Sequence, residues 1–131
     1  MRNLFIVLVL GSVSLCVVSL GICDSLDDAG ESANTASNYA DKAQNPANLK
    51  DAQYRSRQTV SATSEAKNAA LDAKSYRAAD YEGAAYDYSR KAASAKSVKD
   101  AQFYSRQAAK AANNARSTVD YDINKRKKST K

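Results

Sequence analysis

The chain of 131 residues has no histidine or tryptophan, one proline, four glycines and two cysteines. Without histidine it lacks the most common general base and a usual zinc ligand. Both cysteines, Cys16 and Cys23, fall within the first 23 residues, so the chain beyond them has neither a thiol nucleophile nor a disulfide. So few glycines also exclude a glycine-rich phosphate loop. We therefore expect no enzyme, no cofactor, no metal site and no small-molecule substrate.

An N-terminal targeting segment is indicated by an apolar run over 4–22 that follows Arg2 and precedes an acidic stretch. This order predicts a secretory signal peptide over 1–23, cut after Cys23 or after Gly21. Two alternatives are an uncleaved signal anchor and a bacterial lipoprotein signal in which Cys23 carries the lipid. The leading interpretation makes the protein secreted and extracellular.

Large apolar side chains are scarce beyond the predicted signal peptide, where alanine fills 25 of 108 positions. Alanine has the highest helix propensity but buries little area, so helices should form readily and pack thinly. The sequence therefore predicts an all-α chain that is marginal as a monomer. We expect helicity to rise with concentration as the alanine faces of separate chains pair.

An internal repeat is evident in two similar phrases, KDAQYRSRQ at 50–58 and KDAQFYSRQ at 99–107. Shifted by 49 residues, segment 36–66 matches segment 85–115 at 13 of 31 positions. This predicts two tandem repeats of about 49 residues, arranged as helical hairpins or in a coiled-coil-like way. The predicted organisation comprises a signal peptide (1–23), an alanine-rich helical region (24–124) with repeats at about 30–78 and 79–127, and a basic tail (125–131).

Each phrase is preceded by a helix-start signal. Asn48 and Ser97 stand three residues before Asp51 and Asp100, a spacing that lets side chains satisfy the free amide groups of a first helical turn. Helices should therefore begin at 49 and 98. Pro46 marks a break before the first start. The segment before the second start has no proline or glycine, so that start could be a kink within a longer helix.

The spacing of small residues extends these starts into helical faces. A stripe of small and apolar residues follows each start, and Gly83 is a candidate bend. The predicted helices lie near 32–44, 49–80, 84–96 and 98–122. The predicted stripes are Leu49, Ala52 and Ser56; Val98, Ala101, Ser105, Ala108, Ala112, Ala115 and Val119; and, at a and d spacing, Leu71, Ala78, Tyr81, Ala85, Tyr88, Ala92 and Ala95.

Candidate partner-binding residues come from aromatic and cationic side chains on these helices. Tyr54 and Phe103 each precede an arginine by three residues, which puts ring and guanidinium on one face. A solvated helix surface with incidental neighbours is the alternative. The residues proposed to bind a second copy or an extracellular protein are Tyr54, Arg57, Phe103, Arg106, Tyr81 and Tyr88.

Charge is concentrated at the C-terminus. Residues 24–124 carry 14 acids and 14 bases, whereas 125–131 carry five bases and no acid. Such a tail could bind an anionic glycan, nucleic acid or a membrane surface, or be a frayed solubilising terminus. The candidate polyanion-binding residues are Lys125, Arg126, Lys127, Lys128 and Lys131. The acid pairs, such as Asp80 with Glu82, lack calcium-loop spacing and are interpreted as solubilising charges or helix-end features.

The leading functional hypothesis is a secreted, non-catalytic helical protein that acts through helix–helix association with itself or an extracellular partner. The first alternative is a cationic secreted effector, for host defence or polyanion binding, that acts through the tail. Two further alternatives are a hydrophilic stress protectant and a precursor cleaved at the dibasic pair 125–126.

Overall fold

The computed structural model describes residues 25–131, so the predicted signal peptide lies outside the described residues. Within that range the chain is all-α, as predicted. A helix over 25–43 is followed by α2 (Leu49–Asp72), α3 (Tyr76–Ala93) and α4 (Val98–Ser129). A search of the described helices finds none long and apolar enough to cross a membrane.

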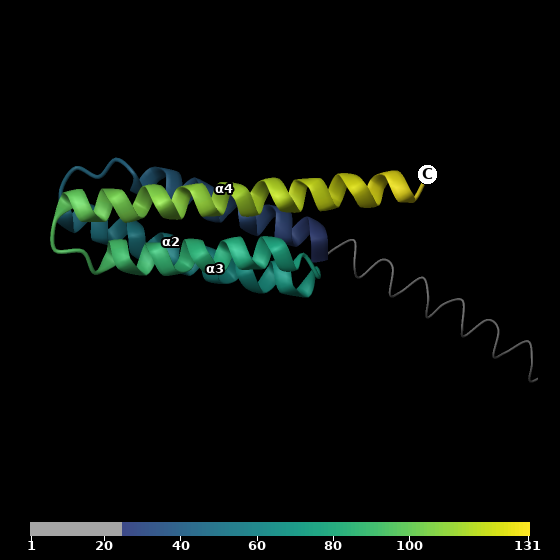
Figure 1. The fold of residues 1–131 in the computed structure, drawn as a ribbon, viewed down its shortest axis with the longest axis horizontal. Helices are drawn as coiled ribbons and strands as arrows, with labels where there is room; N and C mark the ends of the chain where they lie inside the picture. Colours follow the sequence, from purple (N-terminus) through teal and green to yellow (C-terminus); the bar gives the residue numbers. More distant parts are fainter. Residues whose placement is uncertain (1–24) are drawn as a thin grey trace, which may run out of the picture.

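The four helices form a bundle in which the chain reverses at three short turns (Figure 1). Short connections make consecutive helices antiparallel neighbours. α3 packs along both α2 and α4, whereas α2 and α4 touch less extensively across the bundle. The helix over 25–43 contacts α4 through Ser37, whose Oγ donates a hydrogen bond to Asn113 Oδ1 at 2.6 Å. α4 extends past the other helices at one end (Figure 1).

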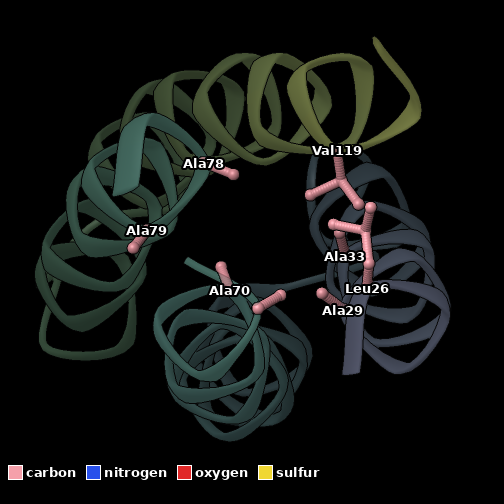
Figure 2. Packing of buried hydrophobic residues seen from close by; sticks show 8 residues of the cluster. Leu26, Ala29, Ala33, Ala70, Ala78, Ala79 and Val119 are labelled. Carbon is pink, nitrogen blue, oxygen red and sulfur yellow. The ribbon is translucent and has the colours of Figure 1, made fainter. Parts of the chain in front are cut away.

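The apolar side chains of the core are almost all alanine. Among the described residues, Leu26 and Val119 are the only buried apolar side chains of another type. They join a cluster that draws on all four helices, at the end where α2 turns into α3 (Figure 2). At the same end, a Cβ on Gly30 would lie 3.2 Å from Ile123 Cδ1, so glycine there allows close approach to α4. The alanine faces thus pack against one another within one chain.

The predicted starts of α2 and α4 are confirmed. Asn48 Oδ1 accepts from the Asp51 amide at 2.9 Å, and Ser97 Oγ accepts from the Asp100 amide at 3.0 Å. The second start is a full reversal of the chain and not a kink in a longer helix. Ser97 adopts an extended conformation, with φ −134° and ψ 152°, which ends any continuation of α3 into α4.

The break between α2 and α3 is not where the sequence predicted it. A single helix over 49–80 is wrong, because the chain turns at 73–75 with Lys74 in the left-handed conformation (φ 58°). The Ser75 amide donates to Ala70 O at 2.8 Å and the Lys74 amide donates to Leu71 O at 2.9 Å, which is a Schellman motif. Glycine usually fills that position, so the lysine there did not indicate a helix end in the sequence. Gly83, the predicted bend, lies within α3.

Side chains of α4 hold the turn at 73–75. Ser75 Oγ donates to Asp122 Oδ2 at 2.6 Å, and Arg126 Nη2 donates to the Ala73 carbonyl oxygen at 3.0 Å. α4 therefore does not end near 122 as predicted but continues to Ser129. Three bases in its last turn favour this extension, because cations stabilise the negative end of a helix dipole. The first helix also begins earlier than predicted, since residues 25–31 are already helical.

Candidate functional site: outer aromatic surfaces and a buried carboxylate

The first two predicted partner-binding rings lie on the outside of the bundle. Tyr54 on α2 is 61% exposed and Phe103 on α4 is 56% exposed. Arg57 and Arg106 are exposed beside them, but the structure does not bring either guanidinium over these rings. Tyr54 Oη instead accepts from Gln58 Nε2 at 3.3 Å, while Phe103 lies edge-on to Tyr104 with ring centroids 5.3 Å apart.

Tyr81 and Tyr88 lie on α3, at the edge of its buried face, and are half-buried. The Arg77 guanidinium is 5.8 Å from the Tyr81 ring centroid. Lys91 Nζ is 5.6 Å from the Tyr88 centroid and 5.9 Å from the Tyr104 centroid, so one ammonium group joins α3 to α4. Leu71, which the predicted stripe placed inside, is 42% exposed. It belongs to α2, and the turn at 73–75 separates it from the α3 residues of that stripe.

The residues 49 positions before Tyr88 and Lys91, which are Tyr39 and Lys42, form a similar surface. It lies between the helix over 25–43 and α2. Lys42 Nζ is 5.9 Å from the Tyr39 ring centroid, as Lys91 is near Tyr88. A groove of about 320 Å³ runs between these helices. Its lining residues are Tyr39, Lys42, Asp51, Tyr54, Arg55 and Gln58. The sequence analysis missed Tyr39 and Lys42 as candidates, although the 49-residue offset from the α3 pair could have found them.

Arg55 differs from its counterpart in the second half of the chain, which is Tyr104. Its Nε donates to Asp51 Oδ1 at 2.8 Å and its Nη1 donates to the Lys42 carbonyl oxygen at 3.0 Å. The Arg55 hydrogen bond holds the pKa of Asp51 below its ordinary value. This pair fixes the turn before α2 to the end of the preceding helix.

A larger groove of about 590 Å³ lies on the surface between α2 and α3. Its rim is mostly cationic, with Arg57, Arg90 and Lys91 opposed by one acid, Asp87. Arg90 lies over Tyr86, with the guanidinium 5.8 Å from the ring centroid. Within 25–131, no cluster of acidic side chains is arranged to hold a metal ion. The groove is thus lined by more basic than acidic side chains.

The predicted polyanion-binding residues differ in how far they are exposed to solvent. Lysines 125, 127, 128 and 131 are exposed. Arg126 is half-buried and donates to the Ala73 carbonyl oxygen, so it helps hold the α2–α3 turn. Asp27 lines the same small pocket as Arg126 and Lys127, which places an acid beside two of the five bases.

Glu82 is the one acidic or basic side chain in the described chain that is fully buried, at 0% exposure. Neither carboxylate oxygen has a hydrogen-bond partner, and burial raises its pKa to about 8. The prediction that Asp80 and Glu82 are solubilising charges or helix-end features is therefore wrong for Glu82, which lies buried within α3, whereas Asp80 is exposed. The signal was its spacing from Ala78, Ala85 and Ser89, which all lie on the buried face of α3.

The other buried polar side chains in 25–131 all have partners. Ser75 and Ser37 donate to side chains of α4. Three more donate to carbonyl groups of their own helices: Thr59 to Arg55, Thr63 to Thr59 and Ser89 to Ala85. Ser56 and Ser105 contact each other. Glu82 is therefore the exception in a core whose polar groups are otherwise satisfied.

No protein-family model, curated protein or solved structure matches the chain.

Proposed function

We propose that this chain is a secreted, non-catalytic helical protein that associates with further copies of itself through two equivalent outer surfaces. The first surface comprises Tyr39, Lys42, Tyr54 and Gln58, on the helix over 25–43 and α2. The second comprises Tyr88, Lys91, Phe103 and Gln107, on α3 and α4. We also infer that the two halves of the chain are tandem repeats, which is why one surface recurs as the other.

The observation that carries the proposal is that the 49-residue offset preserves exposed residues as well as buried ones. Packing accounts for Ala52 and Ala101, which lie in one core cluster. It does not account for Tyr54 and Phe103, because both rings lie mostly in solvent. Aromatic side chains are costly to leave exposed and are enriched where proteins bind one another. Retention of an aromatic ring at both positions supports a role in binding.

The alanine faces are not available for association while the bundle is closed. Ala36, Ala62 and Ala66 form one cluster between the helix over 25–43 and α2, and similar clusters fill the rest of the core. A second copy would therefore meet the outside of the bundle, where rings lie beside lysine and arginine. Such ring and cation pairs contribute about 0.5–1 kcal/mol each when exposed and more when desolvated by a partner.

Two equivalent surfaces on one chain make association bivalent. A protein with two binding surfaces forms closed rings or open chains according to the rotation between neighbours. Removal of both surfaces should leave monomers. Removal of one should stop growth at the dimer or abolish assembly, depending on whether like surfaces meet.

Sedimentation velocity of the secreted protein from about 1 to 100 μM tests this proposal. The wild type should shift to species larger than a monomer, whereas Tyr54→Ala combined with Phe103→Ala should stay monomeric. Asn68→Ala combined with Ser117→Ala is the matched control, since both are exposed polar residues on the same two helices. A monomeric wild type at 100 μM, or a double aromatic variant that assembles like the wild type, would contradict the proposal.

The second candidate function is a cationic effector, favoured by the part of α4 that extends past the other helices (Figure 1). Lys125, Lys127 and Lys128 are exposed on α4 near Arg126, and Lys131 is exposed just beyond the end of the helix. Affinity for heparin at several salt concentrations tests it. Lys125→Ala with Lys128→Ala should weaken binding and reduce its salt dependence. Unchanged binding would exclude the tail as the polyanion site.

A further inference from the structure

Glu82 occupies a position where the first half of the chain has an alanine. Counting back 49 residues from Glu82 leads to Ala33, which is buried in the core cluster shown in Figure 2. On α3, Glu82 follows Ala78 and Ala79 by one turn and precedes Ala85, all of them buried. The first half of the chain thus has a small apolar residue at this position, Ala33, and the second half has a carboxyl group, Glu82. Packing alone does not require the carboxyl group.

Among residues 25–131, no buried group around Glu82 compensates a negative charge. The buried faces of the helix over 25–43, of α2 and of α4 contain alanine, serine, threonine, one leucine and one valine, and no other titratable side chain. The half-buried charged residues lie toward the bundle ends, where Asp51 pairs with Arg55, Asp122 accepts from Ser75, and Arg126 donates to Ala73. Lys67 is exposed on α2, and its Nζ would lie 3.8 Å from a Cβ on Gly83, but neither Glu82 oxygen has a hydrogen-bond partner.

The nearby buried hydroxyl groups do not donate hydrogen bonds to Glu82 either. The Thr63 and Ser89 hydroxyls donate to carbonyl oxygens of their own helices at 2.8 Å each. An ionised carboxylate at Glu82 would therefore be buried without a hydrogen bond or a counter-charge, which is strongly unfavourable. The neutral acid is the form that the closed bundle tolerates.

We propose that Glu82 makes closure of the bundle pH-dependent: the neutral carboxyl group stays in the core, and its ionisation as pH rises drives the side chain out and loosens α3 from its neighbours. The chain has no histidine, so the usual group that titrates between pH 5 and 8 is missing. Apart from the α-amino group, Glu82 is then the group expected to change charge in that interval.

The direction of the effect follows from linkage. The folded-state pKa of Glu82, about 8, lies above the ordinary value of 4.5 that applies to the unfolded chain. Between these two values the folded protein holds a proton that the unfolded chain has lost. Stability is therefore greatest near the lower value and falls as pH rises toward 8. Above 8 both states are ionised at this residue, and the loss is complete.

Urea denaturation of the secreted protein at pH 5, 6, 7 and 8 tests the proposal. The folding equilibrium constant of the wild type should fall by on the order of a hundredfold over this range, because each pH unit within the window changes it by up to tenfold. Glu82→Gln keeps the size of the side chain without its titration, and Glu82→Ala recreates the residue at position 33. Both should change by less than about threefold over the same range.

Glu65→Gln is the matched control, because Glu65 is an exposed carboxyl group on α2. It should retain the wild-type slope. A carbon-detected NMR titration gives a second, direct readout, since the chain has three glutamates and Glu82 should titrate near pH 8. A wild-type folding constant that is flat or rises from pH 5 to 8 would overturn the proposal. So would a Glu82→Gln variant with the wild-type slope.

Discussion

Ser56 Oγ on α2 lies 3.5 Å from Ser105 Oγ on α4, although 49 residues separate them in the chain. Both side chains are buried, at 1% exposure. Ala52 and Ala101, which are also 49 residues apart, lie in one core cluster. α2 and α4 run parallel across the bundle, so residues at matched positions in the two phrases meet near its centre.

Small side chains at this contact are a steric requirement. We predict that Ser56→Leu lowers the free energy of unfolding by about 1–3 kcal/mol, because the added volume has no free space between α2 and α4. Ser61→Leu, at an exposed position on the same helix, should change it by less than about 0.5 kcal/mol. Urea denaturation of both variants checks this, and equal effects would show that α2 and α4 do not meet at Ser56.

The serine hydroxyls themselves should matter little. The distance of 3.5 Å is long for an O–H···O hydrogen bond, so this contact is weak. Replacing both partners by alanine removes a weak bond without leaving a buried polar group unpaired. Ser56→Ala combined with Ser105→Ala should therefore unfold within about 1 kcal/mol of the wild type. A larger loss in a double-mutant cycle would mean that the hydroxyls hold the contact.

The turn at 73–75 gives a third prediction. Lys74 has φ 58°, a conformation that costs a side chain with a Cβ about 1 kcal/mol relative to glycine. Lys74→Gly should therefore raise the free energy of unfolding by about 1 kcal/mol. Lys110→Gly, in the interior of α4, should lower it by about 1 kcal/mol. Thermal unfolding of the two variants should shift in opposite directions, and a shared decrease would contradict the left-handed turn.

Arg126 provides a fourth prediction, because it lies in the basic tail but has a structural hydrogen bond to Ala73. Arg126→Ala should lower the free energy of unfolding by about 1.5 kcal/mol, as expected for a lost hydrogen bond to a charged group. Lys125→Ala, one residue earlier and exposed, should change it by less than about 0.5 kcal/mol. Indistinguishable melting curves for the two variants would mean that Arg126 does not hold the turn.

Local signals explain what could be predicted from the sequence. The starts at Leu49 and Val98 depend on a cap and a carboxylate only three residues apart, so no knowledge of the fold was needed to find them. The small-residue stripe of α4 was also correct, since its alanines and Val119 are buried. In both cases the information lies within one or two helical turns.

The missed features depend on contacts between distant segments. The 73–75 turn has lysine at the position where glycine would have indicated a helix end, and Asp122 and Arg126 hold it from the far end of the chain. Glu82 was misassigned because a charged residue is normally exposed. The spacing of Glu82 from Ala78 and Ala85 places it on the buried face of α3, but the charge of the side chain outweighed that signal in the sequence analysis.

Helicity and mass, measured on the same samples across a hundredfold range of concentration, test the central claim most directly. The sequence alone predicted that helicity rises with concentration, whereas the structure closes the alanine faces within one chain. The present account predicts that far-ultraviolet circular dichroism per residue stays constant while the sedimenting mass rises, because association uses the outer surfaces of a bundle that is already folded. Helicity that rises together with mass would contradict it, because the alanine faces would then pair between chains.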